Sequence, residues 1–311
     1  MNPVRALVLA VGAAAILTPT LADRAAAQGS SQGSSFTQKI NAYVGCINRL
    51  SERSYDSRRR YFSWAAQSGP TGKERIIYGL YTIYETADCR KNVEKANALE
   101  PRDATLEAAA SAYVEAVAKL ELLLKQADDY YQQENYKDDK MAKGKAMHPH
   151  LVGAWEAFAS ADKALRGGVD GINDRRAAER LVEIEKNEGR KARYHIEALM
   201  IQAKRVLRAN DQAKPDVAAI TAALDEYEAT VKALDQLAGE AKLDSFFISG
   251  AKSYLTSAKQ LMRRIRDKKG FSRGDQMMIN AGGGEMIEGT PQRLMRDYNQ
   301  LVDAYNRGTR S

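Results

Sequence analysis

The sequence predicts an all-α protein in which seven to eight long helices pack antiparallel in a bundle and no sheet forms. Apolar residues recur three and four positions apart over most of the chain, which is the period of one helix face. No segment shows the alternation of apolar and polar residues that is typical of a half-buried strand. Only 7 of the 311 residues are proline, which disfavours a protein of many short strands joined by turns.

The first 35 residues predict an export signal followed by a tether. Arg5 supplies a positive charge, residues 6–17 form a short apolar run, and residues 25–27 are alanines suited to cleavage, so residues 1–27 resemble a signal peptide. Residues 28–35 contain only Gly, Ser and Gln, and we expect a flexible tether there. The first cysteine, Cys46, lies far from the cleavage region, so we expect a soluble periplasmic protein without a lipid anchor.

The helical-bundle domain is expected over residues 36–306, with a possible sub-boundary near residues 167–172 and a disordered tail at residues 307–311. Breakers such as Pro70, Pro101 and the pair Gly167-Gly168 separate the predicted helices, and Asp103 is the expected N-cap of the third. Helices are expected at about residues 36–67, 73–98, 104–131, 138–167, 173–210, 215–238, 244–269 and 291–305, with an irregular loop at 270–289.

The clearest apolar stripe lies in the third predicted helix. Its members alternate four and three positions apart without a break, which is typical of a helix packed along a neighbour. They are Leu106, Ala110, Tyr113, Val117, Leu120, Leu124, Ala127 and Tyr131.

The chain has two cysteines, Cys46 and Cys89. An even pair in an oxidising compartment predicts one disulfide between them. The alternative is a pair of unbonded, buried thiols.

The connection between the third and fourth helices is the best candidate site. Two interpretations fit it. In the first, tyrosine hydroxyls converge with a lysine and a histidine on an anionic ligand; in the second, the segment is a capped, solvated helix hairpin whose tyrosines cover the end of the core. The candidate ligand-binding residues are Tyr131, Tyr136, Asp139, Lys145 and His148.

The same connection resembles the central signature of the YiiG family of exported bacterial proteins. The signature comprises a double tyrosine at residues 130–131, the run Tyr-Lys-Asp-Asp at 136–139, and Lys-Gly-Lys-x-x-His at 143–148. Residues 40–44 and 298–306 are also similar to the family. The resemblance implies an all-helical exported domain without an established activity, in a family often found as lipoproteins; this sequence departs from that pattern because it has no lipid-anchor cysteine.

A metal site or an enzyme is the alternative function. His148, His195 and Glu188 are its candidate ligands, because Glu188 and His195 share one face of a predicted helix. Dimetal helical bundles use a Glu three residues before a His, a spacing that no histidine here has. The sequence also contains no hydrolase motif and no phosphate-binding loop, so an enzyme is the less favoured class and no cofactor is expected.

The charge of the chain bears on its partners. The formal net charge is +7, and basic residues cluster at residues 58–60, 186–208 and 263–273. Such faces can contact anionic membranes or cell-wall polymers, or simply be solvated. No stacking aromatics accompany the charges, so nucleic acid is not expected as a partner. We therefore expect a non-enzymatic protein that binds an envelope protein or an anionic ligand.

Overall fold

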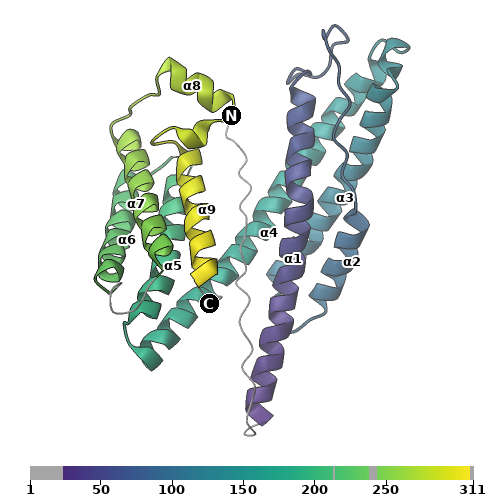
Figure 1. Ribbon diagram of the computed structural model, residues 1–311. Helices are drawn as coiled ribbons and strands as arrows, with labels where there is room; N and C mark the ends of the chain where they lie inside the picture. Colours follow the sequence, from purple (N-terminus) through teal and green to yellow (C-terminus); the bar gives the residue numbers. More distant parts are fainter. Residues whose placement is uncertain (1–23, 213, 238–243, 309–311) are drawn as a thin grey trace. The chain divides into compact units, whose positions relative to one another are not determined.

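The computed structural model describes residues 24–212, 214–237 and 244–308, with side chains from residue 35 onward. The chain divides into two compact units, residues 1–172 and residues 173–311, and helix α4 (Ala142–Glu188) passes from the first into the second. All regular elements among the described residues are helices (Figure 1), which confirms the prediction of an all-α protein. Most of the predicted signal peptide, residues 1–23, lies outside the described part of the chain.

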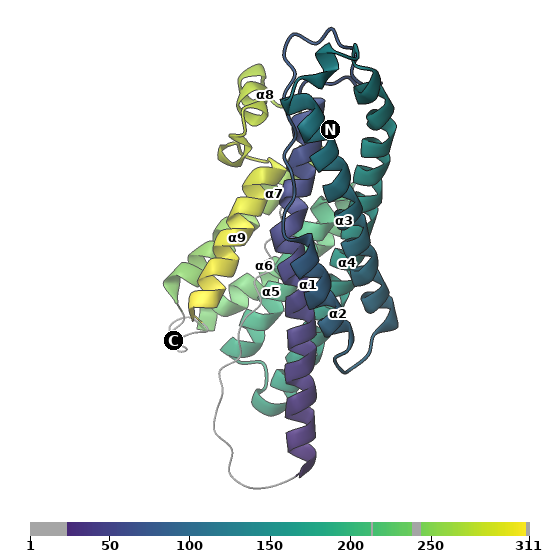
Figure 2. The same cartoon turned by 90° about the vertical axis from the view of Figure 1, so that its right-hand side faces the viewer.

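The described part of unit 1 is a bundle of four α-helices that lie side by side (Figures 1 and 2). Its core is rich in aromatic residues, and Tyr43, Tyr61, Tyr113, Trp155 and Phe158 are all at most 2% exposed. The elements are α1 (Arg24–Phe62), α2 (Thr86–Asn97), α3 (Ala104–Gln132), the short 3-10 helix η1 (Asn135–Lys137) and the first part of α4.

Helix α1 also includes residues 28–35, whose composition predicts a flexible tether. Adding one more turn to an existing helix is much easier than nucleating a new one, so the packed helix that follows supports a helical backbone here. At the other end of the chain, residues 307 and 308 of the predicted tail belong to a helix, and residues 309–311 lie outside the described residues.

Helix α3 begins and packs as its sequence predicts. The Asp103 carboxylate accepts a hydrogen bond from the backbone N–H of Leu106 at 3.0 Å, which caps the helix. All eight members of the predicted stripe are buried; the most exposed of them, Tyr131, is only 3% exposed. The period of the stripe therefore locates the face of α3 that meets the core.

The helix predicted from residue 73 begins only at Thr86. Residues 73–85 are non-helical and run alongside α1 (Figure 2), and we call them the extended segment. β-branched and aromatic residues dominate it, and these lose side-chain freedom in a helix. The backbone N–H of Leu80 donates instead to the α3 residue Asp128 at 2.8 Å. Tyr84, at the end of the segment, is 62% exposed.

The pair Gly167-Gly168 does not end a helix, contrary to the prediction. Helix α4 runs through both glycines to Glu188. A β-carbon on Gly168 would lie 2.9 Å from Cδ1 of Leu106, so the missing side chain lets α4 approach α3 closely. The break falls instead at Gly189, whose φ of 74° is in the left-handed region.

Two buried acids hold unit 1 together. Asp162 of α4 accepts hydrogen bonds from Ser51 Oγ of α1 at 2.6 Å and from Arg166 Nε at 3.0 Å. Lys39, whose side chain is fully buried, lies 2.6 Å from Glu107 of α3. A buried carboxylate is costly unless it is paired. The Ser51–Asp162 contact therefore fixes which positions of α1 and α4 face each other, and the Lys39–Glu107 contact does the same for α1 and α3.

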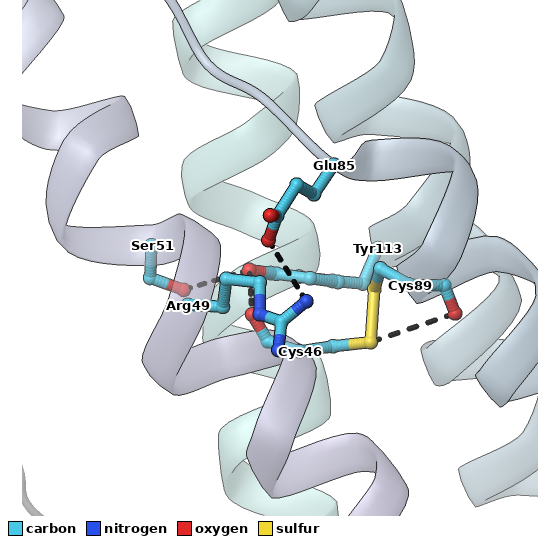
Figure 3. Close-up of a disulfide and its surroundings, with 6 residues drawn as sticks. All are labelled: Cys46, Arg49, Ser51, Glu85, Cys89 and Tyr113. Atoms are coloured by element: carbon cyan, nitrogen blue, oxygen red, sulfur yellow. Dashed lines mark hydrogen bonds and ion pairs between the residues drawn. A yellow bond between two sulfur atoms is a disulfide. The ribbon is translucent and has the colours of Figure 1, made fainter.

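The predicted disulfide joins Cys46 of α1 to Cys89 of α2, with 5.4 Å between the Cα atoms. Both cysteines are at most 4% exposed. Figure 3 shows the bridge beside Tyr113 of α3, whose hydroxyl donates to Ser51 or accepts from it at 2.9 Å. The extended segment thus lies in a loop that the bridge closes between the two helices.

In its described part, unit 2 contains the end of α4, four longer helices and a short one (Figure 1). Tyr227 and Tyr254 stack edge to face in its core, and Asp297 is buried with hydrogen bonds from Arg296 at 2.7 Å and from Ser257. The elements are α5 (Ala192–Asn210), α6 (Val217–Leu237), α7 (Ser245–Arg266), α8 (Arg273–Asn280), the 3-10 helix η2 (Gly284–Met286) and α9 (Pro291–Gly308).

Helix α8 lies inside the stretch predicted to be an irregular loop. A capping box forms it: the Ser272 side chain accepts from the N–H of Asp275, and the Asp275 carboxylate accepts from the N–H of Ser272. None of the helices in the described ranges is both long enough and apolar enough to cross a bilayer.

Candidate functional site

The candidate site lies at one end of unit 1, where η1 joins α3 to α4. We call this region, residues 130–148, the hairpin end. Glu134, Lys140 and Met141 have positive φ values of 58°, 54° and 68°, which are uncommon for residues other than glycine. Such conformations cost about 1–3 kcal/mol each and persist only where the surroundings hold them. Met141 is fully buried, and its backbone N–H donates to Tyr136 O at 3.1 Å.

Asp139 caps the start of α4. Its carboxylate accepts from the Tyr130 hydroxyl at 2.7 Å and from the backbone N–H groups of Lys143 at 2.9 Å and Ala142 at 3.2 Å. The hydrogen bond from Tyr130 and those from the backbone lower the pKa of Asp139. The carboxylate is therefore ionised and committed to the helix end.

Tyr131 lies beneath the surface of the hairpin end. Its ring packs edge-on against Trp64 of the connection after α1, with 5.0 Å between ring centroids, and lies 6.5 Å from the half-buried ring of Tyr136. The Tyr131 hydroxyl and the Trp64 Nε1 are buried atoms without a hydrogen-bond partner in the described part of the chain. Burial raises the pKa of Tyr131 well above its usual value, so the phenol stays neutral.

His148 has both ring nitrogens engaged. Its Nδ1 lies 2.9 Å from the hydroxyl of Tyr61, and its Nε2 lies 3.2 Å from the carbonyl oxygen of Gln67. A carbonyl only accepts, so Nε2 carries a proton, and in the neutral ring Nδ1 accepts from Tyr61. Gly69 leaves room for this ring, since a β-carbon there would lie 3.2 Å from it. These contacts fix the imidazole in place between α1 and α4.

Lysines form the exposed part of the hairpin end. Lys140, Lys143 and Lys145 are all exposed, and no ion pair involves any of them within the described ranges. The Lys143 ammonium lies 5.7 Å from the centroid of the Tyr130 ring. The structure thus brings Tyr131, Tyr136, Asp139 and His148 together as the support of the hairpin end, and it leaves Lys145 facing solvent.

The three metal candidates are divided between the units. His148 belongs to unit 1, whereas Glu188 and His195 belong to unit 2. Glu188 forms an ion pair with Arg193, and His195 packs edge-on against Tyr194 with 5.4 Å between ring centroids. No group of three or more His, Cys, Asp or Glu side chains among the described residues is arranged to hold a metal ion.

Sequence reasoning missed one surface of unit 1. Arg60 and Arg53 of α1 stack on Tyr78 and Tyr81 of the extended segment, with 3.9 Å and 4.2 Å from each guanidinium carbon to the ring centroid. Tyrosines at positions 78, 81 and 84 recur every third residue, a spacing that fits an extended three-residue repeat as well as a helix. That ambiguity, together with the expected helix, concealed the surface.

Comparison with known proteins extends the resemblance seen in the sequence. Residues 34–307 match a family described as "Protein of unknown function (DUF3829)". The chain is also similar to "Uncharacterized protein YiiG" of Escherichia coli (strain K12), with 36% identity over 276 residues that cover 87% of this chain and 78% of the relative. No solved structure matches the chain. The similarity to YiiG over most of the chain confirms the resemblance inferred from the motifs of the hairpin end.

Proposed function

Since the chain belongs to the DUF3829 family of proteins of unknown function and is similar to YiiG over most of its length, we propose that it is an exported, non-enzymatic binding protein of the cell envelope. Two features support export. Residues 1–27 have the composition of a signal peptide, and a disulfide joins Cys46 to Cys89, a bond that persists in oxidising compartments.

The hairpin end is the proposed binding surface, and its ligand is anionic. The observation that carries this proposal is the group of three exposed lysines, Lys140, Lys143 and Lys145, which stand without carboxylate partners in the described ranges. Two left-handed residues, one of them Lys140 itself, shape the backbone between η1 and α4. A backbone held in an unusual conformation beside unpaired charges is typical of a recognition site.

A binding role fits the side chains better than catalysis does. A general base must be free to take a proton from a substrate. Asp139 instead accepts three hydrogen bonds, two of which cap α4, and His148 uses both ring nitrogens within unit 1. Because both ring nitrogens of His148 already have hydrogen-bond partners, no observation favours the alternative of a metal site there.

Native mass spectrometry of the protein recovered from its own compartment tests the proposal. We expect a bound anionic mass on the wild type, and its loss when Lys140, Lys143 and Lys145 are all replaced by Gln. In parallel, the protein should be mixed with vesicles containing phosphatidylglycerol, because a lipid headgroup supplies the same anionic chemistry. Binding in either assay that depends on these lysines supports the proposal, and the assay that responds identifies the source of the anion.

A matched control is available on the same unit. Lys91, Lys95 and Lys119 are also exposed and lie on α2 and α3, away from residues 130–148 in the sequence. Replacing these three by Gln removes the same charge, and we expect binding to persist. An apo mass together with no vesicle binding would contradict the proposal, as would equal losses in the two triple variants.

A further inference from the structure

The extended segment, residues 73–85, is anchored to α1 by two arginines. Arg60 Nε donates to the carbonyl oxygen of Gly79 at 3.3 Å, and Arg53 Nε donates to that of Thr82 at 3.1 Å. In each arginine, the hydrogen bond from Nε to the extended segment fixes the position of the guanidinium group. The two arginines lie seven positions apart on α1, which places them on one face of the helix.

The exposed side of this segment carries tyrosines at a regular spacing. Tyr78, Tyr81 and Tyr84 are 37%, 38% and 62% exposed, whereas Leu80 and Ile83 between them are at most 4% exposed. A buried residue therefore precedes Tyr81 and Tyr84, and the tyrosine rings share the outer side. Exposed aromatic groups in a row are uncommon on a surface that contacts only water.

Arginines and tyrosines alternate along this surface. The guanidinium carbon of Arg60 lies 3.9 Å from the ring centroid of Tyr78 and 5.5 Å from that of Tyr81, and Arg53 lies 4.2 Å from the Tyr81 centroid. We call these four residues the tyrosine–arginine ladder. Stacking on a ring face holds a guanidinium in place while its Nη atoms keep their hydrogen-bonding capacity.

The two ladder arginines differ from their neighbours on α1 in their charge partners. Arg49 pairs with Glu85 at 2.8 Å, and Arg59 pairs with an aspartate one turn earlier. Arg53 and Arg60 form no ion pair with any carboxylate in the described ranges of the chain. Their positive charges are thus both fixed and uncompensated, which lowers the entropy cost of binding a carboxylate.

We propose that the tyrosine–arginine ladder is a docking surface for an acidic segment of another protein. The unpaired guanidinium groups are complementary to carboxylates, which they can bind through two parallel hydrogen bonds. Tyrosine and arginine are also among the residue types that contribute most binding energy at protein interfaces. Ile76, near the start of the same segment, is 51% exposed and adds apolar area to the surface. A protein segment can cover this area with its own apolar side chains, whereas a partner recognised by charge alone has no use for it.

None of the four ladder residues is a lysine of the hairpin end, so the inference goes beyond the proposed function and can fail independently of it. The probe is a fluorescein-labelled decapeptide rich in glutamate and leucine, titrated into the full chain and followed by fluorescence anisotropy. We expect saturable binding that weakens at least about tenfold when Arg53→Gln and Arg60→Gln are combined, since two charge-assisted contacts are lost.

The control variant combines Arg49→Gln and Arg59→Gln, which removes the same charge from the same helix. Because these two arginines already have carboxylate partners, we expect an affinity within about twofold of the wild type. Replacing the three hairpin lysines by Gln should likewise leave peptide binding intact. Equal losses in the Arg53/Arg60 and Arg49/Arg59 variants would show that only net charge matters, which overturns the proposal.

A second measurement on the wild type guards against a misfolded variant. Addition of the acidic peptide should slow amide hydrogen exchange across residues 76–84 and leave exchange in α6 unchanged. In addition, Tyr78→Phe and Tyr81→Phe keep the stacking rings and should keep the affinity. Absence of peptide binding would overturn the proposal. Arginine-dependent binding only to phosphatidylglycerol vesicles, or only to a polyuronate, would replace the protein partner with a lipid or a glycan.

Discussion

Removal of the disulfide should destabilise unit 1 by about 4 kcal/mol. The bridge joins cysteines that are 43 positions apart, and a closed loop of that length removes about 4 kcal/mol of chain entropy from the unfolded state at room temperature. Since a domain is stable by only about 5–15 kcal/mol, the loss is a large share of the total. For a unit of this size it corresponds to a fall in melting temperature of roughly 10 °C.

The assay is urea unfolding of the full chain, followed by far-ultraviolet circular dichroism. Three samples are compared: the oxidised wild type, the wild type with dithiothreitol, and Cys46→Ala combined with Cys89→Ala. The reduced wild type keeps both sulfur atoms. The difference in unfolding free energy between it and the double variant therefore measures the contribution of sulfur packing alone. Alanine is chosen because a serine hydroxyl at either buried position requires a new hydrogen-bond partner.

The origin of the effect can also be tested. Because the bridge acts on the unfolded chain, its loss should increase the dependence of the unfolding free energy on urea, since the open chain exposes more surface. The helical signal at low urea should stay unchanged. Free energies of unfolding within about 1 kcal/mol of each other in the oxidised and reduced wild type would refute the reasoning.

Further substitutions in unit 1 test its core, its buried charge and its glycines, each by thermal unfolding. Leu120→Asp places an unpaired charge in the α3 stripe and should cost about 4 kcal/mol or more, whereas Leu122→Asp, at a side chain 63% exposed on the same helix, should change stability by less than about 0.5 kcal/mol. Hydrogen bonds from Arg102, which has the larger effect, and from the buried Lys39 lower the pKa of Glu107 to about 2. Its charged form therefore stabilises the fold above pH of about 4, near the pKa of an unfolded glutamate, and this stability is lost as pH falls toward 2; Glu107→Gln should flatten that part of the profile. Gly144→Ala places a β-carbon 2.9 Å from a buried tyrosine hydroxyl and should destabilise by about 1–3 kcal/mol, while Gly153→Ala, in open space within a helix, should stabilise by about 0.5–1 kcal/mol.

Each of these expectations has a clear contrary outcome. A folded Leu120→Asp protein with wild-type melting would show that the α3 stripe does not face the core. Parallel acid profiles for wild type and Glu107→Gln would show that this carboxylate does not link stability to pH. Equal melting temperatures for Gly144→Ala and Gly153→Ala would show that the hairpin end tolerates an added methyl group.

Periodic segments were predictable from the sequence because their pattern and their packing agree. In α3 the residues from Leu106 to Tyr131 form one unbroken stripe, and Asp103 provides a cap at its start. The helix end predicted at the glycines 167 and 168 was wrong, since a glycine that ends a helix and one that admits a neighbouring side chain look alike in sequence. Only the contact with Leu106 distinguishes the two roles.

The candidate site was predictable in place but not in detail. The sequence located the hairpin end, yet it could not reveal that His148 is held by Tyr61 and Gln67, which lie 87 and 81 residues earlier. Long-range contacts of this kind depend on how α1 packs against α4. The tyrosine–arginine ladder was missed because residues 73–85 carry a three-residue spacing that also fits a helix, and their β-branched composition was the signal that could have separated the two.

The bond between Cys46 and Cys89 also determines the covalent connectivity of the surface proposed for docking. All four ladder residues lie within the ring that this bond closes. A protease that cuts once inside the ring, for example after the exposed Arg75, opens it into two arms but releases no fragment while the bridge is oxidised. The nicked protein should therefore migrate as one band in a non-reducing gel and as two bands after reduction. Until reduction, the bridge keeps the ladder arginines on α1 covalently joined to the ladder tyrosines, which precede α2.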